Sequence, residues 1–244
     1  MKSIALRAIY TPAILGFLLI TGCASGPQAN PTDPLEPFNR GVYRFNEGVD
    51  QAVLKPVAEG YRAVTPQLVR AGVSNFFNNL EDLWSSLNGV LQLRPQVAAD
   101  NFMRFTTNSV FGLGGVLDIA TEAGIERKTE DLGKTLGRWG VPAGPYIVMP
   151  LFGPSTVRDA STIVVERRYS PLSQINDNGA RNSLTVLNIV DTRTNLLRLT
   201  NMLDEMALDK YSFTRDAFLQ RRRADIYRPG QEKDDERLEM QEKK

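Results

Sequence analysis

Residues 65–91, TPQLVRAGVSNFFNNLEDLWSSLNGVL, decide the fold class of this 244-residue chain. Apolar side chains recur every three or four positions along the segment, which is the period of an α-helix. Thr65 and Pro66 form the N-cap and first-turn pair expected where such a helix starts. Between Val69 and Phe77 the helix is apolar over more than a narrow stripe. It is therefore expected either inside a helical domain or with one face on lipid.

The helical period continues on both sides of this segment. An apolar stripe from Phe38 to Val53 recurs at helical spacing after Pro37. Strand signals are scarce, since only residues 146–151 suit an extended chain and they lie among prolines and glycines. We expect a mainly α-helical domain, with further helices after Pro95, after Ser155 or Thr156, over about 180–208 following a turn at Asp177, and over about 212–226.

The composition excludes much enzyme chemistry. The chain has no histidine, one cysteine, and 29 basic against 28 acidic side chains. Without histidine there is no Ser-His-Asp or Cys-His pair and no ordinary His-containing zinc site. A single cysteine permits no intramolecular disulfide and no paired-cysteine metal or redox motif. The near-zero net charge argues against a nucleic-acid binder. We expect neither catalysis, nor a metal, nor an organic cofactor.

Two short patterns resemble functional motifs but are incomplete, and a third is a short basic run. GKT at 133–135 resembles the end of a P-loop, but Lys128 stands where the first glycine is needed. The glycine-rich run at 112–115 follows a helix rather than a strand, so a helix C-cap with a tight turn is expected there. The basic run RRR at 221–223 predicts a solvated helix face, with contact to lipid phosphates or an acidic partner as the alternative.

Residues 1–22 are predicted to be a lipoprotein signal peptide. A basic start and an apolar run too short to span a membrane lead into LITGC, which ends at Cys23. This pentapeptide resembles the bacterial lipobox, in which the cysteine is acylated and becomes the new N-terminus. The alternative is an ordinary secretory signal with a chance cysteine. By resemblance to sorted lipoproteins, Ala24 in place of aspartate implies the outer membrane, with the lipid-anchored domain on the periplasmic side.

The mature chain divides into three parts. Residues 23–36 are rich in proline, glycine and small polar side chains and predict a flexible spacer after the lipidated Cys23. Residues 37–228 carry the helical period and form the predicted domain. Residues 229–244 are almost wholly charged or polar, which is typical of a disordered, solvated tail.

Ordered motifs run along the helical domain: DPLEPFNR at 33–40, GVSNF at 72–76, FMRFTTN at 102–108, GLGGVLD at 112–118 and GKTLGRWGV at 133–141. Together they resemble the MlaA (VacJ) family of outer-membrane lipoproteins. The resemblance covers essentially all of the chain between spacer and tail, and the lipobox agrees with it independently.

This resemblance implies a ring of amphipathic helices around a central channel, embedded in the inner leaflet of the outer membrane. Such proteins remove mislocalised phospholipids from the outer leaflet and hand them to a soluble periplasmic carrier, MlaC, which maintains outer-membrane lipid asymmetry. Trimeric porins are the expected outer-membrane partners. The alternative function is a non-catalytic structural lipoprotein that braces porins or the cell wall.

Polar residues inside apolar segments are candidates for the lipid path, because such groups must pair or face water. The alternative is that they form structural ion pairs which hold the ring together. The candidates are Arg104, Asn108, Asp118, Arg138, Arg158 and Asp159.

A charged segment, AGIERKTEDL at 123–132, falls where the family has a loop beside the channel, and the resemblance implies a gate. Its glycines would supply either flexibility or tight turns. The gating candidates are Gly124, Glu126, Arg127, Lys128 and Gly133.

Overall fold

The computed structural model describes residues 33–227. The predicted signal peptide, the lipidation site Cys23, most of the spacer and the tail at 229–244 lie outside the described residues.

The first arm of the structure is one long helical segment. It comprises α2 (Glu36–Val49), a π-helical turn η2 (Asp50–Leu54) and α3 (Lys55–Val64). Pro56 lies in the first turn of α3 and has no N–H to donate, so the hydrogen-bonding pattern changes immediately before it. The stripe predicted from Phe38 to Val53 therefore does lie on a continuous helical segment.

The helix α4 (Gln67–Leu91) pairs with α5 (Pro95–Phe111) in a helical hairpin. Thr65 does not cap α4. Its N–H donates to the carbonyl of Tyr61 at 3.0 Å, so it closes α3, and Pro66 occupies the N-cap position of α4 instead. The prediction of an N-cap at Thr65 was wrong by one residue because the preceding helix extends up to it.

Small residues let the two helices of the hairpin come close together. A Cβ atom on Gly89 would lie 2.8 Å from the backbone nitrogen of Ala98. The hydroxyl of Ser86 donates to the carbonyl of Ala98 at 2.9 Å. Gly112 ends α5, and Leu113, Gly114 and Gly115 have positive φ, which confirms the predicted cap and turn.

The second half of the chain places its helices around a short β-hairpin. Strands β1 (Tyr146–Met149) and β2 (Gly153–Thr156) are antiparallel, and β1 lies within the segment predicted to be extended. Side-chain caps of Thr156, Asp177 and Asp209 begin the three helices that follow. The remaining elements are α6 (Ile119–Glu122), α7 (Leu132–Arg138), α8 (Val157–Tyr169), η3 (Pro171–Gln174), α9 (Asn178–Met206) and α10 (Lys210–Ile226).

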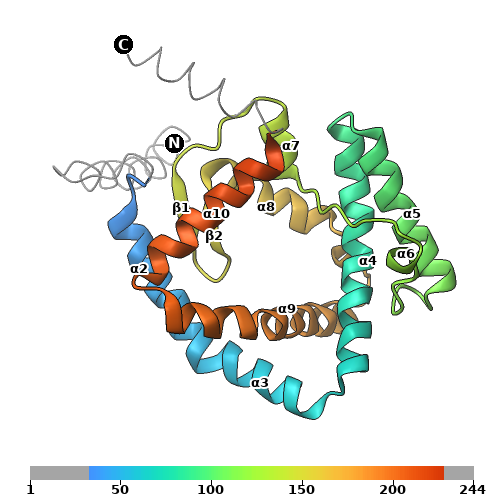
Figure 1. The fold of residues 1–244 in the computed structure, drawn as a ribbon, viewed down its shortest axis with the longest axis horizontal. Coiled ribbons are helices and arrows are strands. Elements are labelled where there is room, and N and C mark those ends of the chain that lie inside the picture. The colour runs from blue at the N-terminus through green and yellow to red at the C-terminus, as the bar shows by residue number, and fades with distance from the viewer. Residues whose placement is uncertain (1–32, 228–244) are drawn as a thin grey trace, which may run out of the picture.

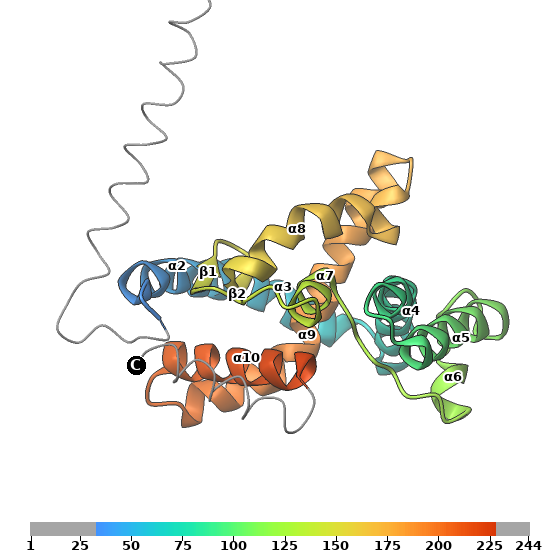
Figure 2. The same ribbon diagram turned by 90° about the horizontal axis from the view of Figure 1, so that it is seen from above.

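These elements are arranged as a ring (Figure 1). Helices α3 and α9 lie side by side along one part of it, the α4–α5 hairpin forms another, and α7 and α8 form a third. Helices α2 and α10 and the β-hairpin close the circle. A perpendicular view shows the end of α8 and the start of α9 rising out of the ring (Figure 2). The mainly α-helical, ring-like fold predicted from the sequence is confirmed.

The apolar core is small and lies where α2, β1 and α10 meet. It is formed by Tyr146, Val148 and Tyr211, with partly buried side chains of α2 and α10 against them. Asn39 on α2 hydrogen-bonds both the carbonyl of Tyr146 and the N–H of Val148, at 3.1 and 2.9 Å. The side-chain amide of Asn39 thus takes the place of a third strand on the open edge of β1.

The polarity of the molecule is reversed relative to an ordinary soluble domain. Among residues 33–227, 10 apolar residues are buried, whereas 22 polar or charged residues are buried and 34 large apolar side chains are exposed. Water-soluble domains bury their large apolar side chains and leave charged ones outside. No helix in the part of the chain that the structure describes is both long and apolar enough to span a membrane.

Candidate functional site

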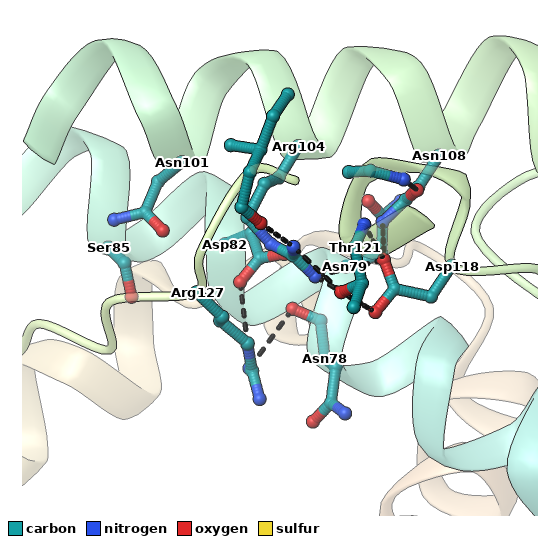
Figure 3. Close-up of polar contacts among 12 residues, drawn as sticks. Asn78, Asn79, Asp82, Ser85, Asn101, Arg104, Asn108, Asp118, Thr121 and Arg127 are labelled. Atoms are coloured by element: carbon teal, nitrogen blue, oxygen red, sulfur yellow. Dashed lines mark hydrogen bonds and ion pairs between the residues drawn. The ribbon is translucent and has the colours of Figure 1, made fainter. Parts of the chain in front are cut away.

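Arg104 on α5 is the centre of the first buried polar cluster (Figure 3). Its side chain is 2% exposed, and its Nε donates to Asp82 on α4 at 3.1 Å. The Nη2 atom donates to both carboxylate oxygens of Asp118, at 2.9 and 3.0 Å. The Nη1 atom donates to the Thr121 hydroxyl at 3.0 Å and to the carbonyl of Ile125. All the guanidinium nitrogens of Arg104 are therefore occupied by protein groups.

Asn108 and Asp118 belong to the same cluster. The amide of Asn108 donates to Asp118 at 3.0 Å and accepts the N–H of Ala120 at 2.8 Å. Asp118 also caps α6 by accepting the N–H of Thr121. Burial raises the pKa of Asp118, but hydrogen bonds from Thr121, Asn108 and Arg104 outweigh it and hold the pKa below its ordinary value.

The predicted gating segment is tied to this cluster by Arg127. Its Nε donates to Asp82 at 2.7 Å, and its Nη2 donates to Glu81 at 2.7 Å. Asp82, which the sequence analysis did not single out, thus lies between Arg127 and Arg104 and is almost wholly buried. Burial raises the pKa of Asp82, and the two arginines act against that rise. The available signal was an aspartate directly before the apolar pair Leu83 and Trp84 in the middle of the helix.

The other gating candidates differ in their surroundings. Lys128 pairs with Asp100 on α5 at 3.1 Å, so two consecutive residues fasten the segment to the α4–α5 hairpin. Gly124 has a φ of 77°, and Glu126 is exposed. Gly133 is a packing residue, since a Cβ there would lie 2.5 Å from both Arg222 and Asp159. A gating role for these five residues stays a prediction.

Asp159 on α8 is the centre of a second buried cluster. It accepts from Arg158 Nε at 2.9 Å and from Arg222 Nε at 2.9 Å. Both terminal nitrogens of Arg222 also donate hydrogen bonds to the carboxylate of Asp131, the N-cap of α7. Burial raises the pKa of Asp131, but Arg222 outweighs it, so the pKa lies below its usual value. This cluster joins α7, α8 and α10.

The prediction of a solvated helix face for residues 221–223 was wrong for Arg222, which forms ion pairs inside the ring. Arg221 and Arg223 are exposed, but the guanidinium of Arg222 points inward because α7 and α8 both present carboxylates to it. Arg138 makes a further connection between α7 and α10, donating to the carbonyl of Asp225 at 2.5 Å.

The six path candidates thus fall into separate groups. Arg104, Asn108 and Asp118 meet in the first cluster, Arg158 and Asp159 meet in the second, and Arg138 bridges two helices. Their mutual bonding favours the structural ion-pair interpretation. Among residues 33–227, no group of three Cys, Asp or Glu side chains is placed to hold a metal ion.

Two cavities lie elsewhere, along α4, and none of the six candidates lines them. One is an apolar pocket of about 430 Å³ between α4 and α9. The other is a mixed polar and apolar cavity of about 540 Å³ between α4, η3 and α9. Both volumes fall within the range of ligand-binding pockets.

The fold and these sites define a class of helical protein whose charged clusters are inside and whose apolar side chains are outside. A family model described as MlaA lipoprotein matches residues 31–225. The chain is also 38% identical over 213 residues to each of two curated relatives named "Intermembrane phospholipid transport system lipoprotein MlaA", from Shigella flexneri and Escherichia coli (strain K12). Each alignment covers 85% of this chain and 84% of the relative.

A solved structure agrees with these relatives. It is described under "Structural basis for maintenance of bacterial outer membrane lipid asymmetry" and superposes with a TM-score of 0.70 at 34% identity. The match covers 80% of this chain and 99% of that chain. The chain belongs to the MlaA lipoprotein family.

Proposed function

We propose that this protein is an outer-membrane lipoprotein that removes mislocalised phospholipids from the outer leaflet and passes them to a periplasmic carrier. The reversed polarity of a chain in this family carries the proposal. Its relatives are named as lipoproteins of an intermembrane phospholipid transport system. Within residues 33–227, 34 large apolar side chains are exposed, and such a surface suits contact with acyl chains.

The energetics of that surface support a position within the membrane. Leu68 on α4, Val110 and Phe111 on α5, and Leu93 between these helices are all strongly exposed. Burying each such side chain is worth about 1.5–3 kcal/mol relative to leaving it in water. The ring is therefore better solvated with its apolar side chains in the inner leaflet of the outer membrane than in the periplasm.

The anchor follows from the same proposal. Cys23 is acylated, and each buried methylene of the attached chains adds about 0.8 kcal/mol of membrane affinity. Asp33 is held in the fold by Asn39, Tyr211 and Arg215. Because a chain of ten residues reaches at most about 35 Å, the anchor keeps the ring at the bilayer surface.

Two partners complete the proposed pathway. A soluble MlaC-like carrier accepts the lipid on the periplasmic side, and a trimeric porin holds the protein in the outer membrane. The protein itself is passive and not an enzyme, so direction comes from the carrier. The buried ion pairs around Arg104 and Asp159 keep the ring in shape, and the segment at 123–132 acts as the gate.

The proposed function is tested by following labelled phospholipid from the purified protein in nanodiscs to its purified carrier. Transfer that depends on the protein is expected. Deletion of the gene is expected to place phospholipid in the outer leaflet and to sensitise cells to detergent with chelator. If the protein is recovered with porin but deletion of its gene leaves the lipid distribution unchanged, the protein is instead a structural lipoprotein.

A further inference from the structure

The apolar pocket and the polar cavity on α4 adjoin each other at Phe77, which lines both. Phe77 is buried and packs edge-on against Phe76 at a centroid distance of 5.3 Å. The structure therefore places a purely apolar compartment next to a mixed one, with an aromatic ring between them.

The apolar pocket suits a hydrocarbon chain. Its lining has no polar side chain: it consists of Leu68, Val69, Gly72, Val73, Phe76, Phe77, Val116 and Leu187. Gly72 sets its depth, because a Cβ there would lie 2.8 Å from Val116 Cγ1. Leu68 and Val69 are exposed, so the pocket opens at the apolar surface of the ring.

The polar cavity has an acidic character. The charged residues of its lining are Glu81 and Asp191. The lining includes no lysine or arginine, and Trp84 and Leu196 form part of its apolar wall. Glu81 is already paired with Arg127. Asp191 is 3% exposed. The site therefore favours a ligand that brings a positive charge.

Asp191 has unused hydrogen-bonding capacity. Its Oδ2 accepts from the Ser74 hydroxyl at 2.7 Å and from the Asn195 amide at 3.2 Å. Its Oδ1 is buried and has no hydrogen-bond partner among the described residues. An unpaired buried carboxylate oxygen is costly, and a cationic donor arriving in the cavity removes that cost.

Two further polar groups without hydrogen-bond partners among the described residues belong to Tyr61 and Arg70, which line neither cavity. The Tyr61 hydroxyl on α3 and Arg70 Nε on α4 are buried and make no hydrogen bond within residues 33–227. Burial raises the pKa of Tyr61, Asp191 raises it further and Arg70 lowers it, so both charges act on this hydroxyl. Asp191 therefore lies near a guanidinium with which it forms no ion pair among the described residues, and its free carboxylate oxygen stays available to a ligand in the cavity.

We propose that the two cavities together bind one zwitterionic glycerophospholipid, with an acyl chain in the apolar pocket and the ammonium of its headgroup beside Asp191. This inference rests on the proposed function and identifies where, and with which headgroup preference, the lipid is held. The apolar pocket adjoins the polar cavity, and in a phospholipid the acyl chains likewise adjoin the charged headgroup, so the two cavities match the two parts of the lipid.

The acyl-chain half is tested by photo-crosslinking. The full chain in detergent is mixed with a phosphatidylethanolamine that carries a diazirine near the end of one acyl chain. Labelling is expected to concentrate on peptides that include Val73 and Leu187. The variant Val69→Trp, on the exposed rim, is expected to lower that labelling roughly tenfold because the indole displaces about two methylenes. Val110→Trp, exposed on α5 and outside the pocket, is the matched control.

The headgroup half is tested by competition between phosphatidylethanolamine and phosphatidylglycerol. Asp191→Asn keeps an acceptor for Ser74 but removes the charge, and it is expected to reduce the preference for the ethanolamine lipid roughly tenfold. Asp216→Asn, on an exposed face of α10, makes the same change away from the cavity. Melting curves of each variant confirm that the fold is retained.

The outcomes separate the two proposals. Labelling spread evenly over the apolar surface, or a headgroup preference that Asp191→Asn leaves unchanged, overturns the inference. These binding assays decide it by themselves, whereas transfer to the carrier decides the proposed function. If lipid is transferred equally well by wild type, Val69→Trp and Asp191→Asn, the transport function stands and this binding site does not.

Discussion

Nη2 of Arg104 donates to both carboxylate oxygens of Asp118, at 2.9 and 3.0 Å, and the Arg104 side chain is almost completely enclosed. Hydrogen bonds between an arginine and a carboxylate are charge-assisted and stronger than neutral ones. The pair fastens the segment after α5 to the α4–α5 hairpin, and the same guanidinium neutralises the buried Asp82. Its geometry indicates a structural role.

Removing Arg104 is expected to destabilise the protein strongly. Arg104→Ala leaves Asp82 buried with one cation fewer, and breaking such a buried pair typically costs about 3–5 kcal/mol. Arg104→Lys keeps the charge, but an ammonium cannot reach Asp82, Asp118 and Thr121 at once as the planar guanidinium does, so an intermediate loss is expected. Denaturant unfolding in detergent measures both. An Arg104→Ala protein that unfolds like wild type but transfers no lipid would instead place Arg104 on the lipid path.

Arg222 offers a sharper comparison because its neighbour is a natural control. Arg222→Ala removes the contacts from α10 to Asp131 and Asp159, and we expect a loss of about 2–3 kcal/mol in the free energy of unfolding. Arg221→Ala, exposed on the same helix, is expected to stay within about 0.5 kcal/mol of wild type. Equal effects of the two substitutions would mean that the second cluster does not hold the ring closed.

Gly133 and Gly60 make a matched pair of helical glycines. Gly133→Ala forces a methyl group against Arg222 and Asp159, and overpacking of this kind costs about 1–3 kcal/mol. A Cβ atom on Gly60 of α3 would meet no atom within 4 Å, so Gly60→Ala is expected to stabilise by about 0.5–1 kcal/mol. Thermal melts of the two variants should therefore shift in opposite directions. A stabilising Gly133→Ala would remove the packing explanation for this glycine.

The pH dependence follows from two carboxyl groups with opposite pKa shifts. Asp131 has a lowered folded-state pKa, so its stabilising contribution is present above its unfolded pKa of about 3.9 and is lost as the pH falls through the folded value. Burial raises the pKa of Glu166, and Asp131 adds to the rise, so ionised Glu166 opposes folding. We expect Asp131→Asn to destabilise at pH 7 and to flatten the loss of stability below about pH 4.

Glu166→Gln is the companion substitution. The amide keeps an acceptor for the N–H of Leu132, which Glu166 now accepts at 2.7 Å, but carries no charge. The free energy of unfolding of Glu166→Gln at pH 7 is expected to equal or exceed that of wild type. Unfolding curves at pH 7 and pH 3 measure both variants. Destabilisation by Glu166→Gln at pH 7 would contradict the sign of its shift.

The helices were predictable from the sequence because helical periodicity, proline positions and caps are local signals. Pro95 begins α5 and Thr156 caps α8 as expected. The ion pairs were not predictable, because their partners are far apart in the chain: Asp82 and Arg127 are 45 positions apart, and Asp159 and Arg222 are 63 apart. Scattered charges therefore looked like path candidates.

The cavities could not be predicted from the sequence for the same reason, since residues far apart in the chain line them. Ser74 and Asp191, which meet at the polar cavity, are 117 positions apart. The periodicity of α4 indicates an apolar helix but not which of its faces is open. For the same reason the sequence left open whether residues 69–77 contact protein or lipid. In the structure Phe77 is buried against protein, whereas Val69 is exposed.

The predicted gate, residues 123–132, can be tested through the ion pairs that hold it. Arg127 and Lys128 hold the segment at 123–132 to α4 and α5 through pairs with Glu81, Asp82 and Asp100. Replacing both with glutamine is expected to raise amide hydrogen exchange in that segment, since partly exposed ion pairs then no longer restrain it. If the segment is a gate, the same variant also changes the rate of phospholipid transfer to the carrier while the melting of α4 and α5 stays near that of wild type. Faster exchange with an unaltered transfer rate would leave these residues a purely structural role.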